Sequence, residues 1–358
     1  MHLPGGPREH LPLRADKTLM DAANEPPAQP EAAPDVADAT GDRPVYAFGL
    51  AITGLAGLLA SADAPAEGPL RAVALRVVGE EEIDRRWQAA DAVRIVDRSW
   101  PDGRLVLAVD EDRAVGYRVD APEFGVHLVS ADGTEVLLPK PEGPPWFAQR
   151  LLFSQSLPIA ATLQGLGLFH ASAVRIDGRV VAVSAASGTG KSSTAAHLIA
   201  HGAEFFTDDV LSLEESDGEI VAFAGPQIAG LVEHEALAID PARRERLGEY
   251  LGMSDKQLRR PALAQTSLPL GALYLLERDP DVEAVTIDAL DTSGTAMLLA
   301  SAFIPHLSTD ARLIGHLELC GTMAGAGQIF RVRAPLRGTA AAVSLVLMDH
   351  ARSRSHGH

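Results

Sequence analysis

The sequence predicts an α/β domain in the C-terminal part of the chain, preceded by a smaller α+β domain. Two observations support this prediction: a series of short hairpin-like strands before residue 140, and a strand–loop–helix–strand unit after residue 168. With 358 residues, of which 46% are hydrophobic, the chain is long enough for two cores. The predicted parts are a disordered tail (1–44), an N-terminal domain (45–145), a second domain (146–350) and a disordered tail (351–358).

The composition excludes several classes of protein. Lys and Arg total 31 against 48 Asp and Glu, which gives a formal net charge of −17. Such an acidic chain is unsuited to nucleic acids or to anionic membrane surfaces, so we expect neither as a partner. The single cysteine, Cys320, excludes an intramolecular disulfide, and we expect it to be a buried packing residue. It fits a reducing compartment, so we expect a cytoplasmic location.

Two segments bear on targeting. Met1 to Pro44 is rich in Pro, Ala and Asp, so we expect disorder there. The segment has no basic region that leads directly into an apolar one, so we do not expect a signal peptide. The uncharged run Val45–Ala62 is marginal in length for a membrane span and contains much Ala, Gly, Thr and Ser. A buried strand over Val45–Thr53 followed by a short helix explains it as well, and this interpretation is favoured.

The N-terminal domain is predicted from short apolar runs separated by turn residues. Gly103 and Gly133 mark two of the turns, and the charged stretch Glu80–Gln88 predicts a helix. The segment Lys140–Pro145 is either a stiff linker or the start of a helix over Trp146–Leu163, kinked at Pro158. The predicted strands are Arg71–Val78, Ala92–Val96, Arg104–Val109, Ala114–Val119, Val126–Ser130 and Glu135–Leu138.

The second domain begins with a predicted hairpin, in which Asp177-Gly178 is a two-residue turn. A glycine-containing loop then leads into a helix, Lys191–His201, and a further strand, Ala203–Thr207. This order predicts a βαβ unit and hence a parallel pair of strands. Further strands are expected near Leu211, Ile220, Leu273 and Val285, and further helices near Ala242, Gly294 and Gly338.

The most specific motif is Gly188-Thr189-Gly190-Lys191-Ser192, between a strand and a helix. Glycines let backbone N–H groups turn onto phosphate oxygens, Lys191 reaches the β and γ phosphates, and Ser192 offers a hydroxyl to Mg²⁺. The pattern is that of a P-loop (Walker A motif), with Ala185 at the usual first glycine, which requires a negative φ there. The alternative is a chance glycine-rich turn. The candidate nucleotide-binding residues are Ser187, Gly188, Thr189, Gly190, Lys191, Ser192 and Ser193.

Asp208-Asp209 follow Lys191 by 17 and 18 residues, at the end of the next predicted strand. The carboxyl ends of parallel strands share one sheet edge, so these carboxylates should face the loop. We predict that Ser192 and Asp209 hold Mg²⁺ and that Asp208 is the catalytic base, although the two Asp roles could be reversed. The alternative is a helix cap or a turn-initiating Asp pair.

The position of His170 follows from the strand-pairing register of the predicted hairpin. If Asp177-Gly178 is a two-residue turn, opposed residues sum to 355 and His170 pairs with Ala185 at the mouth of the loop. There it could orient an Asp, bind a phosphate or carry a proton. A histidine with only a structural role fits nearly as well.

Three stretches resemble the nucleotide-binding core of HPr kinase/phosphorylase: residues 169–174, Ser187–Ser193 and Thr207–Val210. The chain is more similar to the HPr-kinase-like serine kinases found near lasso-peptide and other ribosomal-peptide biosynthesis genes. The resemblance is specific over Leu151–Ala224. It implies a P-loop core of the phosphoenolpyruvate-carboxykinase type, ATP and Mg²⁺ as cofactors, and phosphorylation of a hydroxyl, typically of Ser. It also implies that His170, Asp208 and Asp209 are catalytic.

The chain departs from the bifunctional enzymes beyond Ala224, where their second signature has no match and Gly225-Pro226-Gln227-Ile228 stands instead. Phosphorylase activity and the HPr substrate are therefore not carried over. The later catalytic arginine of the family could correspond to Arg259 or Arg260, although a solvated pair that ends a helix before Pro261 is the favoured interpretation.

Two smaller features remain. Arg243-Arg244-Glu245-Arg246, after Asp240-Pro241, predicts a surface helix or, as the alternative, a surface for an acidic peptide. The end Arg352–His358 is predicted to be a disordered tail.

The sequence thus predicts an ATP- and Mg²⁺-dependent kinase acting on a hydroxyl, with a Ser of a protein or peptide as the expected acceptor. A non-catalytic nucleotide-binding protein and a small-molecule kinase are the alternatives. The acceptor, self-association and the role of the N-terminal domain stay open.

Overall fold

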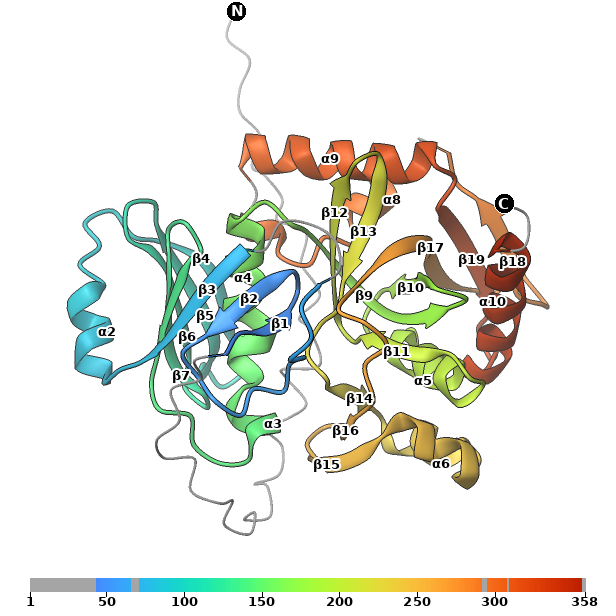
Figure 1. The fold of residues 1–358 in the computed structure, drawn as a ribbon, viewed down its shortest axis with the longest axis horizontal. Helices are drawn as coiled ribbons and strands as arrows, with labels where there is room; N and C mark the ends of the chain where they lie inside the picture. Colours follow the sequence, from blue (N-terminus) through green and yellow to red (C-terminus); the bar gives the residue numbers. More distant parts are fainter. Residues whose placement is uncertain (1–42, 66–70, 292–294, 308, 356–358) are drawn as a thin grey trace, which may run out of the picture.

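The chain forms a mixed α/β structure with two large β-sheets, which lie side by side in Figure 1. We describe it from a computed structural model, which covers residues 43–65, 71–291, 295–307 and 309–355. Nearly all of the predicted N-terminal tail therefore lies outside the described residues. So does Gly294, near which a helix was expected; α8 (Thr295–Leu299) begins next to it.

The first sheet has the strand order β1-β2-β3-β8-β7-β6-β5-β4. The β2–β3 and β3–β8 pairs are parallel, and the other pairs are antiparallel. All six predicted strands are confirmed to within a few residues, as is the charged helix α2 (Glu80–Arg86). The strands are β1 (Val45–Ala47), β2 (Leu50–Thr53), β3 (Arg71–Val77), β4 (Val93–Ser99), β5 (Leu105–Asp112), β6 (Gly116–Ala121), β7 (Gly125–Ser130) and β8 (Glu135–Leu138).

The prediction for Val45–Ala62 was wrong in two respects. Instead of one strand, β1 and β2 form a hairpin, because Phe48 and Gly49 adopt φ values of 59° and 81° and reverse the chain. Turns and bends replace the expected short helix. None of the helices in the described residues has the length and apolar character needed to cross a bilayer.

The helix predicted over Trp146–Leu163 is divided into α3 (Pro145–Ala148), a π-helical turn (Leu152–Ser156) and α4 (Leu157–Leu163). Pro145 is the first residue of α3, so the Pro-rich segment before it leads directly into a helix. The change of hydrogen bonding occurs just before Pro158, which has no N–H to donate.

The second sheet is built around two long strands, β9 and β17. Residues 167–170 of β9 pair with β12, and residues 171–176 pair with β10 and β11. The sheet consists of β9 (Gly167–Ile176), β10 (Arg179–Ala185), β11 (Glu204–Thr207), β12 (Val210–Ser216), β13 (Glu219–Phe223), β17 (Ser267–Asp279), β18 (Thr286–Ala289) and β19 (Ile329–Pro335).

The predicted strand–loop–helix–strand unit is present, but its two strands are not a hydrogen-bonded pair. Both β10 and β11 run antiparallel to β9, which lies between them. The strands therefore point the same way without touching, and their carboxyl ends still lie at one edge. The Asp177-Gly178 turn is confirmed, with φ values of 47° and 80°.

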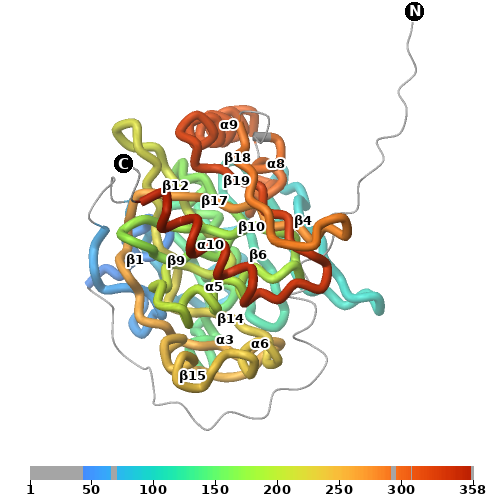
Figure 2. Tube along the Cα trace, turned by 90° about the vertical axis from the view of Figure 1, so that its right-hand side faces the viewer, coloured from blue at the N-terminus to red at the C-terminus, as the bar shows by residue number. Residues whose placement is uncertain are grey.

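Helices cover the second sheet. The helices α5 (Lys191–Ala200) and α10 (Ala340–Ser355) contribute to one apolar cluster, whereas α9 (Asp310–Gly325) packs in another and crosses the top of Figure 1. Figure 2 shows α10 and α5 in front of the strands. Buried Cys320 belongs to the α9 cluster, and burial raises the pKa of its thiol to about 12.

A small third sheet extends from the second one, at the bottom of Figure 1. It consists of β14 (Ala229–Leu231), β16 (Gln257–Arg260) and β15 (Glu249–Met253), next to α6 (Glu233–Ala238) and α7 (Pro241–Arg244). The short helix α7 confirms the predicted helix start, because Asp240 accepts a hydrogen bond from Ala242 N at 3.0 Å. Single 3₁₀ turns occupy Glu245–Leu247 and Pro305–Leu307.

Two predictions about arginines were wrong. Arg259 and Arg260 do not end a helix, because they lie in β16, paired with β14 and β15. Arg352 lies in the last turns of α10, which continues to Ser355, so the predicted tail 351–358 is helical over its first five residues. Residues 356–358 lie outside the described residues.

One apolar cluster connects the two large sheets. It contains residues of the first sheet, such as Val109 and Val136, and residues of the second, such as Val210 and Phe223. The segment 151–161 packs in the same cluster, although the predicted boundary assigned it to the second domain. A shared core of this kind fixes the position of the first sheet relative to the edge that carries the candidate site.

Candidate active site

Two glycines of the loop between β10 and α5 have a left-handed backbone conformation. Gly188 and Gly190 have φ values of 78° and 112°, which side chains disfavour. Ala185 ends β10 and is not among the described non-glycine residues with positive φ, so alanine is accommodated there. Gly190 is the N-cap of α5 and provides no side-chain cap for the first N–H groups of the helix.

Lys191 is buried, with 7% of its surface exposed. Its ammonium lies 2.7 Å from His170 Nε2 and donates to the carbonyl oxygen of Ala185 at 3.0 Å. Because the ammonium can only donate, Nε2 of His170 accepts and Nδ1 carries the ring proton. Lys191 and His170 thus form a connected pair next to the loop.

Asp208 accepts hydrogen bonds from four donors. Oδ1 accepts from Ser172 Oγ at 2.6 Å, from Ser192 Oγ at 2.9 Å and from the backbone N of Asp209 at 3.1 Å. Oδ2 accepts from Gly230 N at 2.9 Å. These four hydrogen bonds fix the Asp208 carboxylate against the start of α5.

Asp209 is arranged differently. Its φ of 71° turns the chain between β11 and β12, and 37% of its side chain is exposed. Nδ1 of His170 lies 3.1 Å from the Asp209 carbonyl oxygen and 3.3 Å from its Oδ1. The Asp209 carboxylate is therefore held by His170 and is partly exposed.

The register of β9 explains why these residues meet. Thr207 of β11 pairs with Ala173 and Val210 of β12 pairs with His170, so the Asp pair interrupts one continuous ladder along β9. The hairpin register is the predicted one: Ser184 pairs with Ala171, a sum of 355. His170 follows at the open end of the ladder, beside the loop.

The structure brings the predicted residues together with different partners from those expected. Ser192 is bonded to Asp208 and not to Asp209, and His170 contacts Asp209 and not Asp208. This arrangement favours the reversed assignment of the Asp pair. Of the other loop residues, Ser187 is exposed and Ser193 is buried in the first turn of α5.

Arg278 was not identified from the sequence. It stands near the end of β17, and its guanidinium donates to Thr189 O at 3.3 Å and to Gly338 O at 2.7 Å. It thereby connects the loop to the segment before α10. No local pattern marks it, because its partners are backbone carbonyls 89 and 60 residues away. Ser172 and Gly230, which orient Asp208, were missed for the same reason.

The two arginines of β16 differ in position. Arg259 is half-buried and lines a small recess together with Ser192 and Asp208, whereas Arg260 is exposed and contacts Gln227. Burial, together with the charge of Arg244, lowers the pKa of Arg259. Its Nη1 donates to Gly248 O at 3.0 Å.

A cavity of about 140 Å³ adjoins the Asp pair. Its walls come from segments far apart in the sequence, namely the β1–β2 turn, the helical segment 146–155, residues 226–230, the β15–β16 turn and Phe303. Asp208 and Asp209 both belong to the lining.

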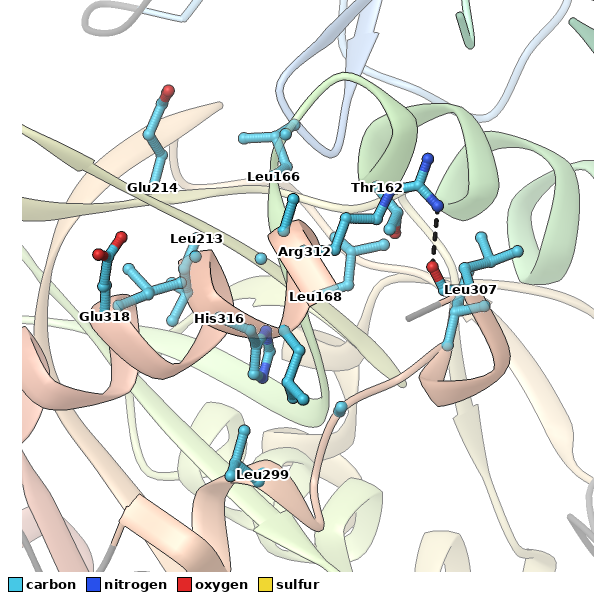
Figure 3. Close-up of a pocket in the computed structure, with 18 of the residues that line it drawn as sticks. Thr162, Leu166, Leu168, Leu213, Glu214, Leu299, Leu307, Arg312, His316 and Glu318 are labelled. Atoms are coloured by element: carbon cyan, nitrogen blue, oxygen red, sulfur yellow. Dashed lines mark hydrogen bonds between the residues drawn. The ribbon is translucent and has the colours of Figure 1, made fainter. Parts of the chain in front are cut away.

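A larger cavity, of about 590 Å³, lies elsewhere, between α9, β12 and the end of α4. Figure 3 shows His316 and Arg312 of α9 among leucines that line it, with Arg312 bonded to the carbonyl oxygen of Leu307. Burial lowers the pKa of His316. None of the predicted site residues lines this cavity.

Comparisons with known proteins identify no family. No family model matches the chain. No curated protein matches it either. Among solved structures, the Hpr(Ser) kinase/phosphatase from Coxiella burnetii is similar over 53% of this chain and 99% of that chain, with 11% sequence identity and a TM-score of 0.29.

Proposed function

We propose that the chain is an ATP- and Mg²⁺-dependent kinase that transfers the γ-phosphoryl group of ATP to a hydroxyl group. The observation that carries this proposal is the convergence of Lys191, Ser192, Asp208 and Asp209 at one sheet edge, at the start of a ten-residue helix. Phosphoryl transfer needs mainly positioning and neutralisation of charge, and these residue types supply both.

The phosphates would be bound by Ser187–Ser193. Positive φ values at Gly188 and Gly190 allow neighbouring N–H groups to point to the same side, and the helix N-terminus favours an anion there. Lys191 would exchange His170 and the Ala185 carbonyl for phosphate oxygens. The buried ammonium of Lys191 is thus already held next to the loop, where an anionic ligand would bind.

The residues next to the loop also fit Mg²⁺. Asp208 and Ser192 present oxygen atoms, which this cation prefers, and they are already within 2.9 Å of each other. When bound, Mg²⁺ would neutralise charge on the β and γ phosphates. In the described part of the chain, no group of three or more His, Cys, Asp or Glu could hold a metal alone, so phosphate oxygens would complete the site.

We assign the role of base to Asp209. Its carboxylate takes the proton of the acceptor hydroxyl while the acceptor oxygen bonds to the γ-phosphorus. The bond from that phosphorus to the β–γ bridging oxygen breaks, and ADP leaves. His170 holds Asp209 in position through Nδ1–H, and its Nε2 is bonded to Lys191. The phosphorylase activity of the bifunctional enzymes is not part of the proposal.

The acceptor is either a Ser of a protein or peptide or a small alcohol. The small volume of the cavity next to Asp209, about 140 Å³, favours an acceptor group of the size of one side chain. This observation keeps a small-molecule kinase as the second candidate, because a metabolite of that size would also fit the cavity.

Lys191→Ala tests the proposal, with exposed Lys140→Ala as the matched control. Both are assayed for ATP binding by calorimetry and for ATP turnover with Mg²⁺. We expect turnover to fall about 100-fold or more in the Lys191 variant, because a preorganised charge next to the phosphates is lost. Unchanged turnover in Lys191→Ala would contradict the proposal, and ATP binding without any transfer or hydrolysis would favour a nucleotide sensor.

A further inference from the structure

The cavity next to Asp209 is partly open, and packing between two distant segments fixes one of its walls. The β15–β16 hairpin lies against the helical segment 146–155: a Cβ added to Gly252 would lie 2.4 Å from Cζ2 of the Trp146 indole. Arg150 and Asp255 form an ion pair of 3.4 Å between the same two elements, with 16% and 8% of their side chains exposed. Tight packing and an ion pair with little exposure fix this wall.

The cavity is apolar over much of its lining. Phe48, Trp146 and Phe153 contribute aromatic rings, and Ile228 and Leu258 contribute aliphatic side chains. A volume of about 140 Å³ is well below the roughly 300–1,000 Å³ of a site for drug-sized ligands. The occupant is therefore a compact apolar group, about as large as one side chain.

The lining carries charged side chains of both signs. Arg150 and Asp255 neutralise each other, and Asp208 and Asp209 belong to the proposed metal and base positions. Lys256 also lines the cavity, and its ammonium has no hydrogen-bond or ion-pair partner among the described residues. A half-enclosed cation of this kind favours an anionic group on the ligand.

Lys256 also lies close to Asp208. A Cβ added to Gly230 would lie 3.1 Å from Lys256 Cδ and 3.8 Å from Asp208 Oδ2, so both side chains approach the same backbone position. Lys256 and Asp209 line the same cavity, so one ligand in it could present an anion to Lys256 and a hydroxyl to Asp209.

We propose, on the basis of the function proposed above, that this cavity is the acceptor site and that it selects hydroxyl compounds that carry an anionic group near the hydroxyl and a compact apolar group. Lys256 binds the anion, and the aromatic residues of the lining receive the apolar group. The hydroxyl proton passes to Asp209 as the new O–P bond forms and ADP leaves. The same chemistry is available from a free hydroxy acid or from a Ser next to an acidic residue in a peptide.

The test uses matched acceptors in two arms, with the full-length chain, ATP and Mg²⁺. One arm compares 3-phenyllactate with its amide, and the other compares a peptide containing Leu-Ser-Asp-Leu with one containing Leu-Ser-Asn-Leu. Phosphorylation is measured by mass spectrometry, and binding of each compound is measured separately by calorimetry without nucleotide. The arm with the higher kcat/KM identifies the source of the acceptor.

We expect the wild type to prefer the anionic member of at least one pair by about tenfold or more in both binding and kcat/KM. Lys256→Met should abolish this preference and Lys256→Glu should reverse it, whereas Lys140→Met should keep it. A preference that persists in Lys256→Met, or no preference in either arm of the wild type, would overturn the inference.

Two outcomes separate this inference from the function on which it rests. If Lys256→Met lowers transfer to both members of a pair and ATP hydrolysis equally, Lys256 acts on the phosphoryl group and the acceptor assignment is wrong, while the kinase assignment stands. If the wild type neither binds nor turns over ATP, the kinase assignment itself fails, and the acceptor assignment fails with it.

Discussion

The two sides of the candidate site are encoded differently. The phosphate side lies within 40 residues, from His170 to Asp209, and is organised by one hairpin and one helix. The acceptor side combines the β1–β2 turn, segment 146–155, the β15–β16 turn and Phe303. The phosphate side therefore depends on local backbone geometry, whereas the acceptor side depends on how distant parts of the chain pack.

The largest effect is expected at Asp209, which lies on the phosphate side and is proposed to act on the acceptor hydroxyl. Asp209→Asn removes the proposed base while preserving the size of the side chain, so phosphoryl transfer should fall about 10²–10⁴-fold with ATP affinity nearly unchanged. The matched control is Asp217→Asn, another Asp with a positive φ, 51°, in an exposed turn. A rate in Asp209→Asn within threefold of the control would rule out Asp209 as the base.

A smaller effect is expected from loosening the phosphate side alone. Arg278→Ala removes the hydrogen bonds to Thr189 O and Gly338 O, so the loop should lose its fixed position. Hydrogen bonds from charged groups contribute about 1.5–3 kcal/mol each, and we expect the KM for ATP to rise about tenfold with little change in acceptor KM. Arg175→Ala is the control, since Arg175 pairs with Glu204 on the surface. An equal rise of both KM values would contradict a separate role for the loop.

The complementary change acts on the acceptor side. In Gly252→Ala, the new methyl group would collide with Trp146, so the β15–β16 hairpin must move away from the helical segment. Acceptor KM should rise several-fold while ATP affinity is retained, both measured in one steady-state titration. Gly315→Ala in α9, where an added Cβ meets nothing within 4 Å, is the control. Weaker ATP binding in Gly252→Ala would show that the two sides are not separable.

The smallest effect on activity is expected from a change in the core of the first sheet, where the predicted effect is on stability. His127 is buried in the first sheet, bonded to Ser156, and burial lowers its pKa to about 3. Between pH 6.5 and this value the unfolded chain binds a proton that the folded chain does not, so stability falls as the pH falls, by at most about 1.4 kcal/mol per pH unit. His127→Asn should make thermal unfolding less pH-dependent by about one proton over this range. An identical pH profile would contradict a neutral His127.

The same contrast explains how much could be predicted from the sequence. Glycines, the Asp177-Gly178 turn and the Asp pair act over short distances, so the hairpin register and the position of His170 followed from spacing alone. The Phe48-Gly49 reversal was missed, because a positive φ at phenylalanine is not anticipated by residue type. Arg278 and Ser172 depend on partners brought close by the sheets, and Lys256 reaches the cavity next to Asp209 only through the packing of distant segments, so no local pattern indicates any of the three.

The separation of β10 and β11 by β9 is a second feature that could not be predicted from local sequence patterns. The order of elements predicted parallel strands, which is correct in direction, but a strand that precedes the unit in sequence lies between them. Sequence order does not determine which strands become neighbours, because β9 pairs with β10 along one edge and with β11 along the other.

The central claim is that the loop and Asp208 bind Mg²⁺-ATP as one site. It is tested most directly by calorimetric titration of the protein with ATP, with and without Mg²⁺, in the wild type and in Asp208→Asn. The account predicts that Mg²⁺ tightens ATP binding about tenfold or more in the wild type, since the carboxylates otherwise repel the phosphates, and that Asp208→Asn abolishes this gain. ATP affinity that is independent of Mg²⁺ in the wild type would contradict it.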